Sequence, residues 1–245
     1  MPTMTASTDL FESAGGDSPG LTADRWAGLA LLTSAVASIA VMAFDANGGG
    51  KDALSIMQGM VRTRGVHQAV HVGQMACLSG LLFAHVHLSQ RLGLQRLAVK
   101  GGLMGYALGV VLMLICTVID GFIIPDTAGA FVQKSPEMVQ AGWSMIEVGY
   151  VALTDLARVA WVLEALGVLA LSVALVARRG LSRKIGVVGL VAGALPAAAV
   201  VAVGSNLSGE VIAGVLGLQA VWYLCAAWLL WKGVPNATPI NPSRR

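Results

Sequence analysis

The sequence predicts an all-α fold: a polytopic membrane protein whose bundle of six transmembrane helices leaves both termini in the cytoplasm. Hydrophobic residues occupy 56% of the 245 positions and charged residues only 12%, whereas soluble domains carry about 25% charged residues. The apolar residues gather in six runs of about 20 residues, the length that crosses a bilayer. Basic residues are concentrated in alternate connections between these runs, which sets the orientation.

Each expected helix is a continuous apolar run, which favours helices over the alternating strands of a membrane barrel. Gly, Asn and Pro commonly follow helix ends, and Ile124-Pro125-Asp126 is expected to end the third helix. The expected spans are residues 26–44, 66–88, 101–124, 149–177 with an amphipathic lead-in from 137, 185–204 and 211–231.

Two of these helices carry glycine at every fourth position, a spacing that lets helix backbones approach closely in lipid. The third expected helix has Gly101, Gly105 and Gly109, and the fifth has Gly189 and Gly193. We therefore expect both helices to make close contacts inside the bundle.

The distribution of Lys and Arg orients the chain. Segments expected in the cytoplasm hold 11 of these residues and the opposite segments hold 4, as the positive-inside rule requires for six spans. The expected location is the cell inner membrane. We divide the chain into a flexible cytoplasmic N-terminal tail (1–23), a transmembrane domain (24–233) and a flexible C-terminal tail (234–245).

Several classes of function are disfavoured. The net charge of +3 comes from residues in short connections, so the expected partner is the lipid bilayer and not nucleic acid. The three cysteines lie in apolar stretches without a CxxC pair and are expected to be small buried hydrophobes. No phosphate-binding loop or nucleophile elbow is present in the sequence.

The second expected helix begins with two histidines one turn apart, His67 and His71. They project onto one face, close enough for both imidazoles to reach one metal ion. This HxxxH pattern lacks the glutamate of HExxH, so a carboxylate from another helix would complete the site. Ionisable residues inside membranes are usually functional. The candidate metal ligands are chosen from the ionisable groups of the same half of the membrane: His67, His71, Asp120, Glu147 and Asp155.

The ligand types limit the metal. Carboxylates favour iron, manganese or zinc, and nearby methionines would favour copper. Haem is less expected, because all four histidines lie on one helix and bis-histidine ligation needs both faces of the ring. The alternative is that the histidines form hydrogen bonds inside a polar cluster or lie at the membrane interface.

We expect specific roles for three ionisable residues of the fourth expected helix. Asp155 and Arg158 are three residues apart and are expected to form an ion pair that lowers the cost of burying both. Glu164 projects to another face, deeper in the membrane, and is expected to be neutral or to face a polar partner.

Asp120 stands between apolar residues and is followed by Gly121 and Pro125. This pattern favours a broken helix in which freed carbonyl groups and the carboxylate line a cavity. The alternative is ordinary punctuation at the water interface.

Three functions fit the sequence. The first is a periplasm-facing metal site for redox chemistry or metal handling. The second is a proton-coupled transporter module, supported by ionisable residues at several depths and by Pro196 in the fifth expected helix. The third is an accessory subunit that binds other membrane-protein subunits, in which the polar residues are structural. The sequence does not decide whether the protein is an enzyme.

Overall fold

The computed structural model describes residues 19–45, 49–204 and 209–234, and these contain helices and no strand. Six stretches are long and apolar enough to cross a membrane, as the sequence predicts; α3, η1 and α4 together form one of them. The elements are α1 (Pro19–Met42), α2 (Ala53–Leu92), α3 (Leu97–Val118), the π-helical turn η1 (Ile119–Ile123), α4 (Ile124–Phe131), α5 (Pro136–Val176), α6 (Leu181–Val203) and α7 (Gly209–Lys232). Most of the expected tails, residues 1–18 and 235–245, lie outside the described residues.

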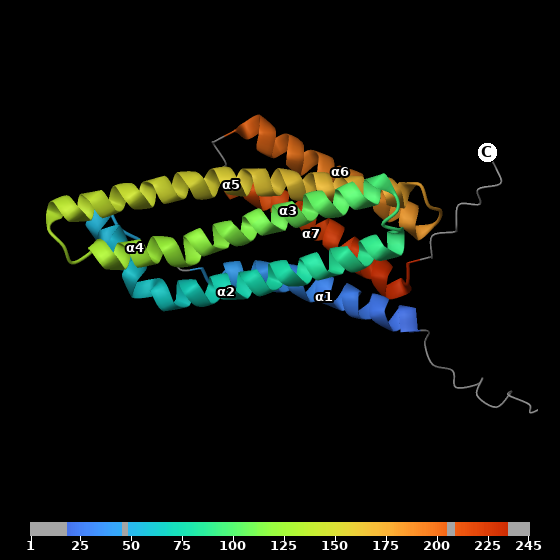
Figure 1. Ribbon diagram of the computed structural model, residues 1–245, viewed down its shortest axis with the longest axis horizontal. Helices are drawn as coiled ribbons and strands as arrows, with labels where there is room; N and C mark the ends of the chain where they lie inside the picture. Colours follow the sequence, from blue (N-terminus) through green and yellow to red (C-terminus); the bar gives the residue numbers. More distant parts are fainter. Residues whose placement is uncertain (1–18, 46–48, 205–208, 235–245) are drawn as a thin grey trace, which may run out of the picture.

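The six spans form a closed ring in chain order. Each packs on the next, in the series α1, α2, α3, α5, α6 and α7, and α7 packs back on α1 (Figure 1). Short connections make consecutive helices antiparallel neighbours. In a helix the backbone N–H and C=O groups bond to one another, and this is required in a membrane because lipid offers them no hydrogen-bond partner.

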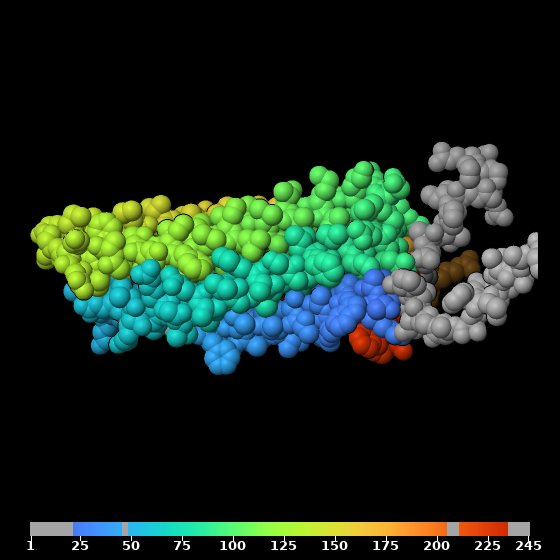
Figure 2. Space-filling view, turned by 60° about the horizontal axis from the view of Figure 1, so that its bottom comes forward, coloured from blue at the N-terminus to red at the C-terminus, as the bar shows by residue number. Residues whose placement is uncertain are grey.

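The helices differ in length. α2 and α5 have 40 and 41 residues, whereas α1 and α7 have 24 each. At a rise of 1.5 Å per residue these are about 60 Å and about 36 Å, and the hydrocarbon core is about 30 Å thick. We call the part beyond α1 the extension (residues 53–66, 124–131 and 136–149). The base is the opposite end, where α1 begins and α7 ends. The extension consists of the first part of α2, the whole of α4 and the first part of α5 (Figures 1 and 2).

α2 begins well before residue 66, where the sequence placed its start, and that boundary was wrong. Asp52 caps the helix: its carboxylate accepts the backbone N–H of Ser55 at 2.8 Å, and the Ser55 hydroxyl accepts the N–H of Asp52 at 3.1 Å. This capping box satisfies two backbone donors. The first turns of α2 are amphipathic and carry Arg62 and Arg64, so a search for apolar runs misses them.

The prediction that Ile124-Pro125-Asp126 ends the third helix was also wrong. The chain stays helical through η1 into α4, and Pro125 stands in the first turn of α4. In η1 the backbone N–H of Ile124 donates to the carbonyl oxygen of Ile119, five residues back. Pro125 has no N–H to donate in this register, so the chain stays helical with one backbone hydrogen bond fewer.

The extension has its own small core. Met57 of α2, Ile124 of α4 and Ile146 of α5 are buried against one another, and Trp143 packs on this group. The larger core lies inside the ring and includes Trp222, which is fully buried. The molecule therefore has two apolar regions, with a junction between them where α1 ends.

Glycines let α3 and α5 touch at the backbone. A Cβ added at Gly167 would lie 2.7 Å from the Tyr106 nitrogen and 2.8 Å from the Gly102 oxygen. Gly105 and Gly109 also face α5, as expected, but a Cβ on Gly101 would meet nothing within 4 Å. The face in contact thus includes Gly102 and not Gly101.

The base is held by a buried carboxylate. Asp24 is 0% exposed, and its Oδ1 lies 2.6 Å from His87 Nε2 and 3.1 Å from Arg91 Nε. Arg91 also donates to the carbonyl of Val234 at 3.2 Å, and Arg178 donates to the carbonyl of Arg91 at 3.2 Å. These contacts join the start of α1 and the ends of α2, α5 and α7.

We expect Gly167→Ala to destabilise the protein, because the new methyl group would push on α3 backbone that cannot rotate away. Overpacking of this kind costs about 1–3 kcal/mol. The free energy of unfolding in mixed detergent micelles measures it. Gly101→Ala is the matched control and should have little effect; equal losses for the two variants would contradict the contact.

Candidate functional site

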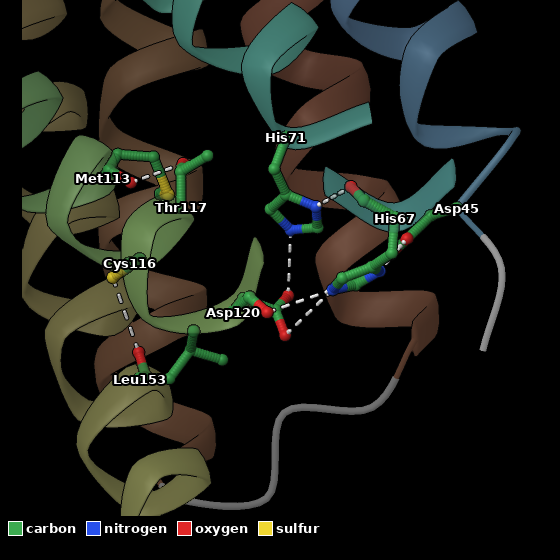
Figure 3. Close-up of polar contacts among 8 residues, drawn as sticks. All are labelled: Asp45, His67, His71, Met113, Cys116, Thr117, Asp120 and Leu153. Carbon is green, nitrogen blue, oxygen red and sulfur yellow. Dashed lines mark hydrogen bonds and ion pairs between the residues drawn. The ribbon is translucent and has the colours of Figure 1, made fainter. Parts of the chain in front are cut away.

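Four ionisable side chains from three segments meet at the junction of the ring and the extension (Figure 3). Asp45 follows α1, His67 and His71 lie on α2, and Asp120 belongs to η1. His71 is buried, and the other three are partly exposed. Three of them, His67, His71 and Asp120, are residues that the sequence predicts as metal ligands.

The π-helical turn explains why Asp120 offers its backbone as well as its side chain. In the register of η1, the carbonyl of Asp120 would accept from the N–H five residues on, which belongs to Pro125 and does not exist. The freed oxygen instead lies 3.0 Å from Nε2 of His67. The expected freed carbonyl is therefore present, although the helix bends into a π-turn and does not end.

Gly121 brings this turn against α2. A Cβ at Gly121 would lie 2.5 Å from Cβ and 2.7 Å from Cγ of His71. Any larger residue would move His71 away from Asp120, so the glycine determines the distance between η1 and the two histidines.

His67 lies between two acceptors. Its Nδ1 is 2.6 Å from Oδ1 of Asp45, and its Nε2 is 3.0 Å from the Asp120 carbonyl and 3.9 Å from Oδ1 of Asp120. A carbonyl oxygen only accepts hydrogen bonds, and an ionised carboxylate does the same.

His71 is placed in the same way. Its Nδ1 donates to the carbonyl of His67 at 2.9 Å, and its Nε2 lies 3.2 Å from Oδ2 of Asp120. The two imidazole rings are 4.3 Å apart between centroids. Both Nε2 atoms thus point toward Asp120.

These contacts leave each imidazole one N–H short, because a neutral imidazole has a single N–H and each ring faces two acceptors. With both carboxylates ionised, positive charge is needed beside Asp120. It can be a second proton on each ring, which offsets the two negative charges of Asp45 and Asp120. A metal ion between the Nε2 atoms and the carboxylate would serve the same purpose.

A cavity of about 220 Å³ opens beside the cluster. Asp45, His67 and Asp120 line its polar part. Its lining also includes Met60, Trp143 and Tyr150 from the extension and the start of the α5 span. The cluster therefore borders a space large enough for a small molecule or several waters.

The other two predicted ligands are not brought into this cluster. Glu147 is exposed on α5 and accepts a hydrogen bond from Trp143 Nε1 at 2.8 Å. The side chain of Asp155 is 65% exposed and pairs with Arg158, the expected partner, at 3.1 Å. Helical projection shows which residues share a face, but not toward which neighbour that face turns.

Asp45 is the site residue that the sequence prediction missed. It follows the apolar run of α1, and its Oδ1 is the nearest partner of His67 Nδ1. The available signal was its position at the same end of the bundle as the histidines. Asp45, His67 and His71 each offer one ligand atom, and these atoms lie within 4.8 Å of one another.

A scan of protein-family models and searches of curated proteins and of solved structures found no match to this chain. The function is therefore argued from the geometry of the site.

We expect Gly121→Ala to displace His71, because the added methyl group would overlap the start of that side chain. The free energy of unfolding should fall by about 1–3 kcal/mol. The imidazole nitrogen resonances of His71 should shift in NMR spectra. For the control Gly129→Ala, the nearest heavy atom to the new Cβ is Arg64 Nη1 at 3.8 Å. Unchanged His71 resonances in Gly121→Ala would contradict the contact.

Proposed function

We propose that the chain is a multi-pass protein of the cell inner membrane that binds one transition-metal ion on its periplasmic side. The observation that carries this proposal is a pair of imidazole Nε2 atoms that face one carboxylate beside a cavity. His71 Nε2 lies 3.2 Å from Oδ2 of Asp120, and His67 Nε2 lies 3.9 Å from Oδ1. Each neutral ring uses its single N–H on one acceptor, so a positive charge is needed where the two Nε2 atoms face Asp120. A metal ion supplies that charge.

The ligands we assign are Nε2 of His67, Nε2 of His71 and the carboxylate of Asp120. Two histidines and one carboxylate, with positions left open, suit iron(II) or zinc better than copper. Asp45 then orients His67 through Nδ1, as carboxylates commonly do for metal-bound histidines.

Binding requires the cluster to contract. The Asp120 carboxylate lies 3.9 Å from His67 Nε2 through Oδ1 and 3.2 Å from His71 Nε2 through Oδ2. Metal–ligand bonds of about 2.0–2.1 Å place the atoms of a tetrahedral site about 3.3 Å apart. Ligation of one ion therefore requires both imidazoles and the Asp120 carboxylate to move closer together by rotation of their side chains.

The positive-inside rule supports the orientation. More Lys and Arg residues, Arg91 and Arg178 among them, belong to the segments at the base than to the extension. With the base in the cytoplasm, the extension and the metal site face the periplasm.

The arrangement favours metal binding at one end over transport through the bundle. Buried Leu78 and Leu81 of α2 and Val110 of α3 follow the site toward the base. Past Gln74 and Thr117, an ion leaving Asp120 in that direction would meet these apolar side chains, which offer no ligand, and such a path is costly in a membrane.

We expect the purified protein to bind one Zn²⁺ or Fe²⁺ per chain. His71→Ala and Asp120→Asn should abolish stoichiometric binding, and Asp45→Asn should weaken it about 10- to 100-fold, because Asp45 orients His67 and is not an assigned ligand. Binding should also weaken as the pH is lowered, since bound protons compete with the ion. Calorimetric titration and elemental analysis measure these effects.

Asp126→Asn is the matched control. Asp126 lies six residues from Asp120, but it is exposed and pairs with Arg64 at 2.6 Å. Its loss should leave metal binding unchanged. The proposal fails if no stoichiometric metal binds, or if His67→Ala and His71→Ala both bind as the unaltered chain does. Helical content by circular dichroism shows that each variant is folded.

A further inference from the structure

A second group of polar side chains lies deep inside the ring, away from the metal site. Its members come from four helices and none exceeds 6% exposure. We call it the core polar cluster: His85 on α2, Tyr106 on α3, Glu164 on α5, and Gln219 and Tyr223 on α7.

The cluster is closely packed around two tyrosines. The Tyr106 hydroxyl donates to the Tyr223 hydroxyl at 3.1 Å. The His85 ring stacks on Tyr106 at 3.6 Å between centroids and meets Tyr223 edge-on at 5.7 Å. Buried polar groups that contact one another in this way fix the positions of their side chains.

Glu164 completes the cluster from α5. Its side chain packs against α3 at Gly109, where an added Cβ would lie 2.6 Å from Glu164 Cγ. Gln219 faces its carboxyl group, and both tyrosines lie near it. One carboxyl oxygen, Oε1, is buried without a hydrogen-bond partner.

No cation offsets a negative charge on Glu164 in the described part of the chain. It forms none of the ion pairs found there. The titratable groups that interact with it are Tyr106 and Tyr223, and His85 is stacked on Tyr106. α6, which packs on α5, has its basic residues only in its first turn. An isolated ionised carboxylate in such surroundings is strongly disfavoured, so a proton must neutralise it.

His85 is not the holder of that proton. Its Nδ1 donates to the carbonyl of Leu81 at 2.8 Å, which accounts for the single N–H of a neutral ring. Its Nε2 is buried with no partner. An imidazolium would bury a second N–H, on Nε2, without an acceptor. A neutral ring leaves only the Nε2 lone pair without a partner, which costs less.

We propose that the core polar cluster is a proton-binding site in the middle of the membrane, with the proton carried by the carboxyl group of Glu164. It is a neutral carboxylic acid in the resting protein. The metal site is a separate feature, and neither site requires the other.

The structure also indicates the side from which the proton exchanges. Ser89 lies one turn beyond His85 on α2, toward the base, and its hydroxyl is fully buried without a partner. In the other direction α2 presents Leu81 and Leu78, both buried and apolar. The proton therefore reaches Glu164 from the base, past Ser89 and His85.

Infrared difference spectroscopy of the metal-free protein tests the proposal. A protonated carboxylic acid has a carbonyl stretch above the amide I band, which moves down in D₂O. We expect this band at neutral pH, its loss in Glu164→Gln, and its retention in Glu147→Gln, whose carboxylate is exposed on the same helix. Absence of the band, or its persistence in Glu164→Gln, overturns the proposal.

Two further variants keep the test informative if Glu164→Gln does not fold. Tyr223→Phe should shift the band without removing it, because the carboxyl group loses a polar neighbour. His85→Phe keeps the ring on Tyr106 and removes the nitrogens, so it should slow deuterium exchange of the band several-fold. His71→Ala, at the other end of α2, should not slow it. Slower exchange in His71→Ala alone overturns the assigned route, and an unshifted band in Tyr223→Phe overturns the location.

Discussion

The π-helical turn η1 is the feature on which the site and the extension both depend. It carries the chain past Pro125 without ending the helix, so α3 continues into α4 and reaches α2 and α5 beyond the ring. The same turn leaves the Asp120 carbonyl without a backbone donor and directs it to His67. One residue more or less in this turn would rotate α4 by about 100°, which would remove Ile124 from the core of the extension.

The bilayer explains how polar groups are distributed through the bundle. Each ionisable group at depth has a hydrogen-bonded neighbour or lies in a cluster, because lipid offers no partner. The charged pairs at the base join helix ends around Asp24, and the pairs of the His67–His71 cluster lie where α1 ends. Between them, Glu164 interacts with the amide of Gln219 and with two tyrosines, and it forms no ion pair among the described residues. On α2, buried Leu78 and Leu81 lie between His71 of the one cluster and His85 of the other.

Several parts of the site could be predicted from local spacing, and others could not. His67 and His71 share a face because they are one helical turn apart. Gly121 and Pro125 indicated that the helix is irregular at Asp120. Glu147 and Asp155 have ligand chemistry as well, but the rotation of α5 turns them outward. Asp45 depends on where α1 ends relative to α2. That level is set by packing between helices and not by any motif.

Composition and the length of the apolar runs were enough to predict an all-α, six-span chain, because each span must be apolar over the thickness of the membrane. The spacing of polar residues was enough to choose one helix face. The boundaries of α2 and α4 were not predictable from hydropathy, since the extension is amphipathic and a π-turn carries no hydropathy signal. Which carboxylates meet the histidines followed from the rotation and the level of neighbouring helices. These are set by close contacts such as Gly121 against His71 and Gly167 against Tyr106, between residues far apart in the chain.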